Sequence, residues 1–350
     1  MKTVTVRASR TYDILIDKGL LSHVGEHLSA LHPAPAKVMI VTDDTVNALW
    51  ADPVEKSLVA SGYTVFRFVF PHGEESKSTE TLVSLWNALA RAGLTRTDLI
   101  VALGGGVVGD MAGFAAATYL RGIEFLQCPT TLLSMVDSSV GGKTGVDLEA
   151  GKNLCGAFYQ PIGVLCDTNA LSTLPAATFA DGCAEVIKYG YIGNPALLAL
   201  LEKPFADDPD EVIAMCVSDK RDVVEEDEHD HGSRQLLNLG HTSGHAIEGC
   251  SHFEISHGSA VAIGMLLMAR AAVKKGLCEA DVPAHMEKLL RAYHLPVDCP
   301  FTAKELVRIA LSDKKRKGNS ITLVLPLRVG KSRLHRISAD ELLDFFAAGL

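Results

Sequence analysis

Residues 37–131 alternate short β-rich runs with helical patterns, and this alternation sets the strongest limit on the fold. The β-rich runs are KVMIVTDD (37–44), YTVFRFVF (63–70), DLIVALGGG (98–106) and IEFLQCPTT (123–131). Helical patterns separate them at 46–62, 81–93 and 107–122. Strands joined by helices of this length predict a parallel sheet covered by helices on both faces.

The second half of the chain has a different character. From about Leu171 the β-rich runs largely disappear and helical patterns follow one another, with only SITLVLPL (320–327) looking extended. A chain of 350 residues is also longer than one hydrophobic core usually supports. We therefore expect an α/β domain over residues 1–170 and a mainly α-helical domain over residues 171–350.

Composition and charge exclude several classes of protein. The formal charge of −9 argues against bulk nucleic-acid or anionic-membrane binding, and the run DKKRKG (313–318) is best explained as a solvated loop. The eight cysteines form no CxxC pair, as expected for reduced thiols. The N-terminal segment lacks the apolar core of a signal peptide, and the longest apolar run, AVAIGMLLMA, is too short to span a bilayer. We expect a soluble cytoplasmic protein.

A glycine-rich turn connects one predicted strand to the next predicted helix. In GGGVVGD (104–110), Gly104, Gly106 and Gly109 have the G-x-G-x-x-G spacing. Such glycines let backbone N–H groups approach a pyrophosphate at the positive end of a helix, although a tight packing turn would also use them. Because the motif follows a later strand and not the first, it indicates a nucleotide-binding α/β domain other than a conventional Rossmann unit.

The stretch VDSSVGGKTGVDLEAGKN (136–153) is neither periodic nor apolar. It contains four glycines and several charged or amide side chains: Asp137, Lys143, Asp147, Lys152 and Asn153. Long irregular loops in compact domains are usually functional or disordered. Apolar segments flank this one, and we therefore expect a loop ordered around an anion.

Two segments of the second half indicate a metal. AEVIKYG places Glu185 and Lys188 three residues apart in a largely apolar helix, where a carboxylate needs a cation, either a lysine or a metal ion. Four of the thirteen histidines fall within seventeen residues: His241, His245, His252 and His257. The first two are four apart and share a helix face. They either hold one metal together, or one holds the metal while the other acts on a substrate.

Five motifs in order resemble those of the 3-dehydroquinate synthases: GGGVVGD, CPTTLLSMVDSSVGGKTGVD, GKNLCGAFYQP, AEVIKYG and LLNLGHTSGHAIE. The resemblance covers about residues 38 to 326. It implies an NAD-binding α/β domain with a parallel sheet, a mainly helical metal-binding domain, and an active site in the cleft between them. The implied reaction converts 3-deoxy-D-arabino-heptulosonate 7-phosphate to 3-dehydroquinate and phosphate, in the shikimate pathway of aromatic amino acid biosynthesis. It proceeds by NAD-mediated transient oxidation, phosphate elimination, reduction and intramolecular aldol closure.

The resemblance also implies a role for individual residues. The ligands of a divalent metal, Zn or Co, would be Glu185, His241 and His257, whereas His245 would contact the substrate phosphate. The catalytic residues would be Asp137, Lys143, Lys188, Asn238 and His245. Substrate-binding residues would be Arg121, Asn153, Lys220, Arg234 and Lys314. The NAD site would be lined by Asp43, Glu74, Lys77, Gly105, Gly106, Val107, Asp110, Thr130, Thr131, Lys143, Lys152 and Thr173. Arg121 would act across the interface of a homodimer, and Lys315 is an alternative to Lys314.

One position departs from the family pattern. The family usually reads HGEAVAIGM after the last metal histidine, whereas this chain reads HGSAVAIGM, with Ser259 in place of the glutamate. We expect that glutamate to orient His257 or to pair with a neighbour, and a water or another carboxylate such as Glu254 to replace it.

Two other functions fit part of the sequence. One is a metal-dependent polyol dehydrogenase of the glycerol dehydrogenase type, which has no use for the anion-binding set Lys143, Lys152, Asn153 and Arg234. Another sugar phosphate cyclase is a closer alternative, and a non-catalytic nucleotide-binding relative is disfavoured by the intact metal set.

Overall fold

The computed structural model describes residues 1–203, 208–314 and 320–350, apart from the side chains of 312–314. The chain forms two compact units, one of Met1–Leu174 with Pro209–His229, the other of Pro175–Asp208 with Asp230–Leu350. The first unit therefore includes helix α8 (Pro209–Glu226), although the sequence analysis placed this segment in the second domain, after a single boundary at residue 170. Helix α8 packs on strands β1 (Lys2–Arg7) and β2 (Thr11–Asp17), and its Glu211 forms an ion pair with Lys2.

Within the described residues, a seven-stranded sheet forms the centre of the first unit, in the order β1-β2-β9-β6-β5-β3-β4. Its other strands are β3 (Lys37–Asp43), β4 (Thr64–Phe70), β5 (Leu99–Gly104), β6 (Glu124–Pro129) and β9 (Gly163–Asp167). Only β1 and β2 pair in the antiparallel sense, and the remaining neighbours are parallel. The predicted parallel α/β sheet is confirmed.

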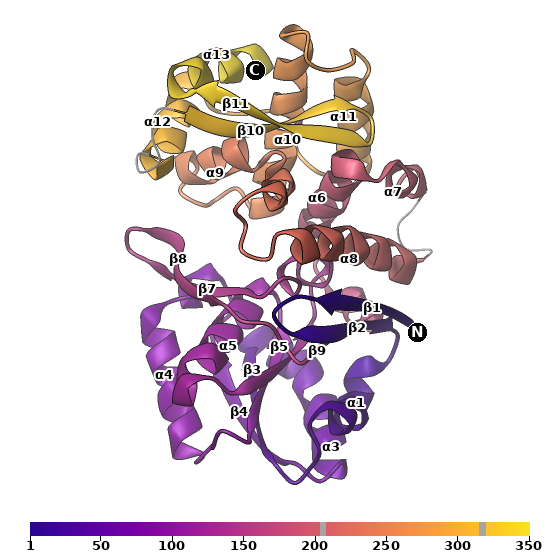
Figure 1. Cartoon of the computed structure of the whole chain (residues 1–350), viewed down its shortest axis with the longest axis vertical. Coiled ribbons are helices and arrows are strands. Elements are labelled where there is room, and N and C mark those ends of the chain that lie inside the picture. Colours follow the sequence, from indigo (N-terminus) through magenta and orange to yellow (C-terminus); the bar gives the residue numbers. More distant parts are fainter. Residues whose placement is uncertain (204–207, 315–319) are drawn as a thin grey trace. The chain divides into compact units, whose positions relative to one another are not determined.

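Helices cover both faces of this sheet (Figure 1). On one face, α4 (Thr79–Arg91) and α5 (Gly106–Thr118) form a core with alternate residues of β3 and β5, such as Met39 and Ile100. On the other lie α1 (Val24–Leu31) and α3 (Asp52–Ala60), which pack on each other. Short helical turns are α2 (Asp44–Val46), η1 (Leu20–His23), η2 (Asn47–Ala51), η3 (Glu74–Ser76), η4 (Tyr119–Arg121), η5 (Ser134–Ser138) and η6 (Thr168–Thr173).

The strand order reverses between β3 and β5. From β3 the chain goes outward to β4, crosses back to β5, and then goes outward in the opposite direction to β6. In open parallel sheets, ligands bind at such a reversal, beyond the carboxyl ends of the strands. Asp43 ends β3 and Gly104 ends β5, so the topology places the glycine-rich turn where a nucleotide is expected.

The segment 136–153 is not an irregular loop, so that expectation is wrong. After η5, strands β7 (Lys143–Leu148) and β8 (Gly151–Phe158) form an antiparallel hairpin. Gly145 pairs with Gly156, where an added Cβ would stand 2.0 Å from the Thr144 carbonyl oxygen. The glycines permit this close approach, and their number hid the strand alternation in the sequence.

Asp98 fixes the start of two central strands. Its buried carboxylate accepts hydrogen bonds from the Lys37 N–H at 2.6 Å, the Thr95 N–H at 2.6 Å and the Thr95 hydroxyl at 2.9 Å. Burial by itself raises the pKa of Asp98, but these donors outweigh burial and hold the pKa below its usual value. The ionised form of Asp98 therefore stabilises the first unit.

The second unit is mainly helical, as predicted (Figure 1). Its helices are α6 (Ala176–Gly193), α7 (Pro195–Leu200), α9 (His241–Cys250), α10 (His257–Lys274), α11 (Val282–Ala292), α12 (Ala303–Lys314) and α13 (Leu342–Gly349), with the turns η8 (Ser233–Asn238) and η9 (Ala339–Glu341). A hairpin of β10 (Ser320–Arg328) and β11 (Lys331–Ser338) covers part of them. Strand β11 was not predicted because its sequence, KSRLHRIS, is largely polar. Helix α10 is buried along most of its length and forms the core of this unit.

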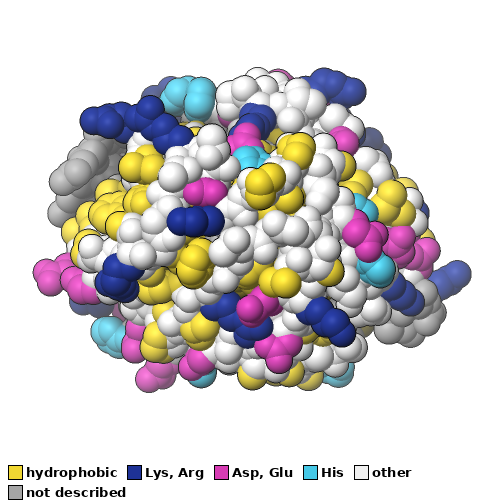
Figure 2. Space-filling model, turned by 90° about the horizontal axis from the view of Figure 1, so that it is seen from below, with side chains coloured by type: hydrophobic (Ala, Val, Ile, Leu, Met, Phe, Trp, Pro, Cys, Tyr) yellow, Lys and Arg dark blue, Asp and Glu magenta, His cyan; other side chains and the backbone are white. Residues whose placement is uncertain are grey.

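Charged side chains of both signs lie on the surface of the protein. On the face seen in Figure 2, acidic and basic side chains are interspersed among apolar and neutral ones. Among the described residues, no helix combines the length and apolar character that crossing a membrane requires.

Candidate active site

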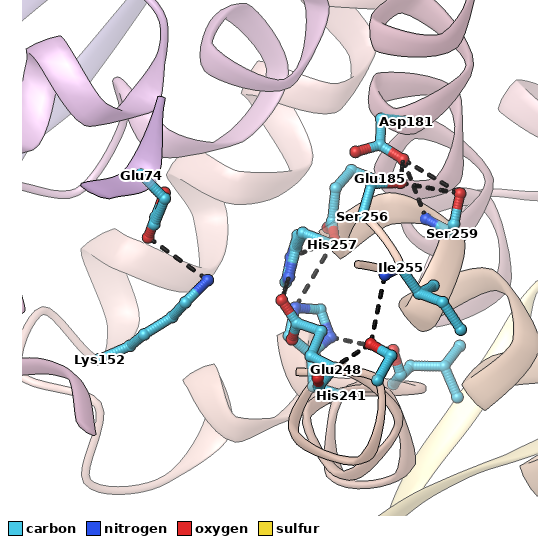
Figure 3. Close-up of polar contacts among 12 residues, drawn as sticks. Glu74, Lys152, Asp181, Glu185, His241, Glu248, Ile255, Ser256, His257 and Ser259 are labelled. Carbon is cyan, nitrogen blue, oxygen red and sulfur yellow. Dashed lines mark hydrogen bonds and ion pairs between the residues drawn. The ribbon is translucent and has the colours of Figure 1, made fainter. Parts of the chain in front are cut away.

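Three helices of the second unit bring Glu185, His241 and His257 together. Glu185 lies in the middle of α6, whereas His241 and His257 are the first residues of α9 and α10. The Glu185 Oε1 atom is 3.6 Å from the Nε2 atom of each histidine (Figure 3). Ligand atoms of all three residues lie within 4.8 Å of one another. The structure thus assembles the three predicted metal ligands from distant parts of the sequence.

The spacing of these atoms fits a metal ion. Ligands about 2.1 Å from a tetrahedral zinc are about 3.4 Å from one another, close to the observed 3.6 Å. Two imidazoles and one carboxylate also leave a coordination position open for a substrate, as catalytic zinc sites do. The Glu185 side chain is fully buried, and a buried carboxylate needs cationic partners. One such partner is Lys188, which is equally buried and forms an ion pair with Glu185.

The pKa values of His241 and His257 are shifted in opposite directions. Burial, opposed by Glu185, lowers the pKa of His241 to about 3, and its Nδ1 lies 3.2 Å from the Leu239 carbonyl oxygen, which can only accept a hydrogen bond. His241 is therefore neutral and directs its Nε2 lone pair toward Glu185. Burial also acts to lower the pKa of His257, but Glu185 and Glu248 together raise it to about 10.

Glu248 is a carboxylate of the site that the sequence analysis missed. Its Oε1 atom lies 3.5 Å from Nδ1 of His257, on the side of the ring opposite Glu185 (Figure 3). The expected substitute for the family glutamate, Glu254, is thus not the carboxylate that faces His257. A signal was present in the sequence, because Glu248 lies seven residues after His241 and therefore on the same side of helix α9.

His245 lies one helical turn after His241 and on the same side of α9. The ring centroids of the two histidines are 5.4 Å apart, and the His245 ring lies 6.1 Å from that of His257. His245 is exposed, whereas Glu185 is buried. The ligand atoms of His245, Glu248 and His257 also lie within 4.8 Å of one another. His245 therefore lies beside the group of Glu185, His241 and His257. Its position alone does not show whether it binds a metal or a substrate.

The glycine-rich turn of the first unit fits a dinucleotide phosphate. Gly105 precedes the thirteen-residue helix α5, and among the described residues no side chain caps this helix start. A Cβ on Gly105 would lie 3.1 Å from Thr131 Cγ2, and one on Gly106 would lie 3.2 Å from Ser138 Oγ. Glycine at these two positions therefore avoids tight contacts with Thr131 and Ser138. The first N–H groups of a helix have no acceptor within that helix and can receive an anion.

Lys77 contacts one predicted nucleotide-binding residue, Asp110, and one predicted substrate-binding residue, Asn153. Its buried ammonium group forms an ion pair with Asp110 at 2.6 Å and donates a hydrogen bond to Asn153 Oδ1 at 2.5 Å. Burial acts to lower the pKa of Lys77, but Asp110 outweighs burial and raises it. Nearby, Lys152 lies 3.5 Å from Glu74 (Figure 3). Five of the predicted residues are therefore joined by three contacts of the first unit.

The remaining predicted residues are distributed over both units. In the first, Lys220 of α8 lies 3.0 Å from Asp137 Oδ1, and the Trp50 indole donates to Thr173 Oγ1 at 3.2 Å. Asp43 ends β3, and burial raises its pKa. Positions for the others are as follows: Val107 in α5, Thr130 and Thr131 after β6, Lys143 at the start of β7, exposed Arg121 in η4, and buried Arg234 and exposed Asn238 in η8. Lys314 ends α12 with its side chain outside the described part, and Lys315 lies wholly outside it.

Comparisons with known proteins agree with this geometry. The family model described as 3-dehydroquinate synthase N-terminal matches residues 67–181, and the one described as 3-dehydroquinate synthase C-terminal matches residues 182–316. A 3-dehydroquinate synthase from Streptococcus sanguinis is 45% identical over 342 residues, which cover 95% of this chain and 96% of that protein.

Two solved structures have a similar fold. One is 2-deoxy-scyllo-inosose synthase complexed with carbaglucose-6-phosphate, NAD+ and Co2+, with a TM-score of 0.88, 27% identity and full coverage of both chains. The other is 2-epi-5-epi-valiolone synthase from Streptomyces hygroscopicus with NAD+ and Zn2+ bound, with a TM-score of 0.87, 28% identity, and coverage of 99% of this chain and 98% of that chain.

Proposed function

The chain belongs to the 3-dehydroquinate synthase family, and we propose that it converts 3-deoxy-D-arabino-heptulosonate 7-phosphate to 3-dehydroquinate and phosphate. The observation that carries this proposal is the convergence of Glu185, His241 and His257 on one point, in a chain that also has a glycine-rich nucleotide turn. As an enzyme of aromatic amino acid biosynthesis, it would act in the cytoplasm.

Two groups complete the site. Bound NAD would supply a reversible oxidation of the substrate, and a bound Zn or Co ion would supply a Lewis acid for its hydroxyl groups. Glu185, His241 and His257 would hold the ion. The start of helix α5, at Gly105 and Gly106, would hold the pyrophosphate of NAD, and Lys77 and Asp110 would order the neighbouring wall of that site. Because the oxidation is reversed within one turnover, the net reaction consumes no NAD.

The anionic groups of the substrate would be held by cationic side chains, although the whole protein is acidic. Lys220 and Arg234 would bind the carboxylate. The phosphate would be surrounded by Lys143, Asn153, His245 and Lys314, with Arg121 contributed by the second copy of a homodimer. These side chains concentrate positive charge on one doubly anionic substrate, as electrostatic complementarity requires.

Three polar side chains would orient the hydroxyl groups that react: Asp137, Lys188 and Asn238. Lys188 is held by its ion pair with Glu185, and Asp137 by its contact with Lys220. In this arrangement the protein contributes chiefly positioning and charge stabilisation.

A direct assay tests the reaction. The purified protein is given the heptulosonate phosphate with catalytic NAD+ and Zn2+, and released phosphate and 3-dehydroquinate are measured. We expect equal amounts of the two products without net NADH. Steady NADH formation from glycerol, with no phosphate released from the sugar phosphate, would instead identify a polyol dehydrogenase.

A pair of variants tests the roles of the two neighbouring histidines. We expect His241→Ala to lose zinc binding and turnover, and His245→Ala to retain zinc while losing turnover. The control is His252→Ala, which changes an exposed histidine outside the described ligand groups and should behave as wild type. Full turnover by His245→Ala would remove the role assigned to that residue, and loss of zinc by the same variant would make it a ligand.

A further inference from the structure

The first turn of helix α10 is held by an acidic residue from another helix. Asp181 of α6 accepts a hydrogen bond from the Ser256 hydroxyl at 2.5 Å, from the Ser259 N–H at 3.0 Å and from the Ser259 hydroxyl at 3.3 Å, all through Oδ1 (Figure 3). Ser256 is the N-cap of α10, and Ser259 is its third residue. The N–H of that third residue has no partner within its own helix, because the first four N–H groups of any helix lack one. Asp181 supplies the missing acceptor.

This arrangement replaces a common local device. In a capping box, the N-cap serine is followed three residues later by a glutamate or glutamine that closes the helix start. Here the third position is Ser259, so the acidic member is absent from α10 itself. In such a box the serine side chain accepts the N–H of the third residue, and here Asp181 accepts that N–H instead. We propose that Asp181 caps α10 from α6 in this way, and that it is thereby a positioning residue for His257.

The geometry explains why this cap would affect the metal ligands. His257 is the first residue of α10 and lies between Ser256 and Ser259, both of which contact Asp181. Asp181 is also four residues before Glu185 and therefore lies on the same face of α6. Helix α6 thus holds the start of α10 through Asp181 and places Glu185 beside His257, the first residue of α10.

Backbone packing at the same point leaves little freedom. A Cβ on Gly258 would lie 2.2 Å from the Asp181 carbonyl oxygen and 2.6 Å from the Asp181 Cα. The two helices therefore touch through their main chains one turn away from the 3.6 Å contact between Glu185 and His257. Asp181 anchors the polar side of this contact, so its loss would let His257 move relative to Glu185.

The test measures zinc binding to the metal-free protein and does not depend on turnover. It rests on the metal role given above to Glu185, His241 and His257, so wild-type affinity is measured first, by competition with a chromophoric chelator. We expect Asp181→Ala to weaken zinc binding about tenfold, at the lower end of the range for residues that orient ligands. We expect the double variant Asp181→Ala/Ser259→Glu to regain wild-type affinity, because it restores the capping box within α10.

Two further variants make the result decisive. Asp281→Ala alters an aspartate that precedes helix α11 in the same unit, and it should leave zinc affinity unchanged. Asp181→Asn retains an acceptor oxygen without charge and should lose less affinity than alanine; it replaces the alanine variant if that protein does not fold.

Wild-type protein that binds no zinc would refute the proposed metal site and not this inference alone. Wild-type affinity in Asp181→Ala with only a lowered melting temperature would leave Asp181 a structural cap and overturn the inference. Failure of Ser259→Glu to restore lost affinity would overturn it as well.

Discussion

The buried pair of Glu185 and Lys188 leads to a prediction that separates stability from function. Both side chains are almost fully buried, and they are joined in an ion pair inside α6. Replacing Glu185 by Met leaves the Lys188 ammonium group in an apolar helix without this carboxylate. Removing one partner of a buried pair costs about 3–5 kcal/mol of unfolding free energy.

Replacing both residues should have a much smaller effect on folding. Buried ion pairs exchanged for apolar side chains of similar volume are often neutral or stabilising. We therefore expect the double variant Glu185→Met/Lys188→Met to fold with a stability within about 1 kcal/mol of wild type. It should nevertheless bind no zinc and form no product, because Glu185 is a proposed ligand.

Urea unfolding of the protein in excess chelator measures these differences without a contribution from bound metal. Both tryptophans, Trp50 and Trp86, lie in the first unit, so fluorescence follows that unit while circular dichroism follows both. The single variant Glu185→Met should unfold at a lower urea concentration than wild type when circular dichroism is measured. The urea midpoint measured by fluorescence should not change. As control, Glu287→Met disrupts the more exposed ion pairs of Glu287 with Arg270 and Arg291 in the second unit and should cost less than about 1 kcal/mol per pair. A single variant as stable as wild type, or a double variant no more stable than the single one, would refute the reasoning.

Three further predictions follow from other contacts. Glu248→Ala removes the carboxylate 3.5 Å from His257 Nδ1 and should weaken zinc binding about 10–100-fold in equilibrium dialysis, whereas unchanged affinity would exclude a role in orienting that ring. Gly258→Ala places a methyl group 2.2 Å from the Asp181 carbonyl oxygen and should lower the unfolding free energy by about 1–3 kcal/mol, which thermal denaturation of the metal-free protein would detect. Asp98 has a folded-state pKa below its unfolded value, so its stabilisation is present above the unfolded value and disappears as pH falls through the folded one. Asp98→Asn should therefore be less stable than wild type at pH 7, and the difference should shrink under acid; a difference independent of pH would contradict this.

Local patterns in the sequence were sufficient to predict the fold class of both units, whereas the candidate site residues came from the family motifs. The alternation over residues 37–131 predicted the parallel sheet, since hydrophobic periodicity depends on neighbours along the chain. Family motifs indicated Glu185, His241 and His257, and the structure brings those three side chains together. Spacing alone left the pair His241 and His245 ambiguous, because residues four apart share a helix face whatever they bind.

Tertiary structure decided what depends on contacts between distant segments. The grouping of α8 with the first unit, the pairing of Gly145 with Gly156, and the carboxylates Glu248 and Asp181 beside the start of α10 were not predicted. Each arises from the way two elements pack, and packing is set by the shapes of both partners. Ser259 can be recognised as unusual in the sequence, but the carboxylate that contacts it, Asp181, is found only through the packing of α6 on α10.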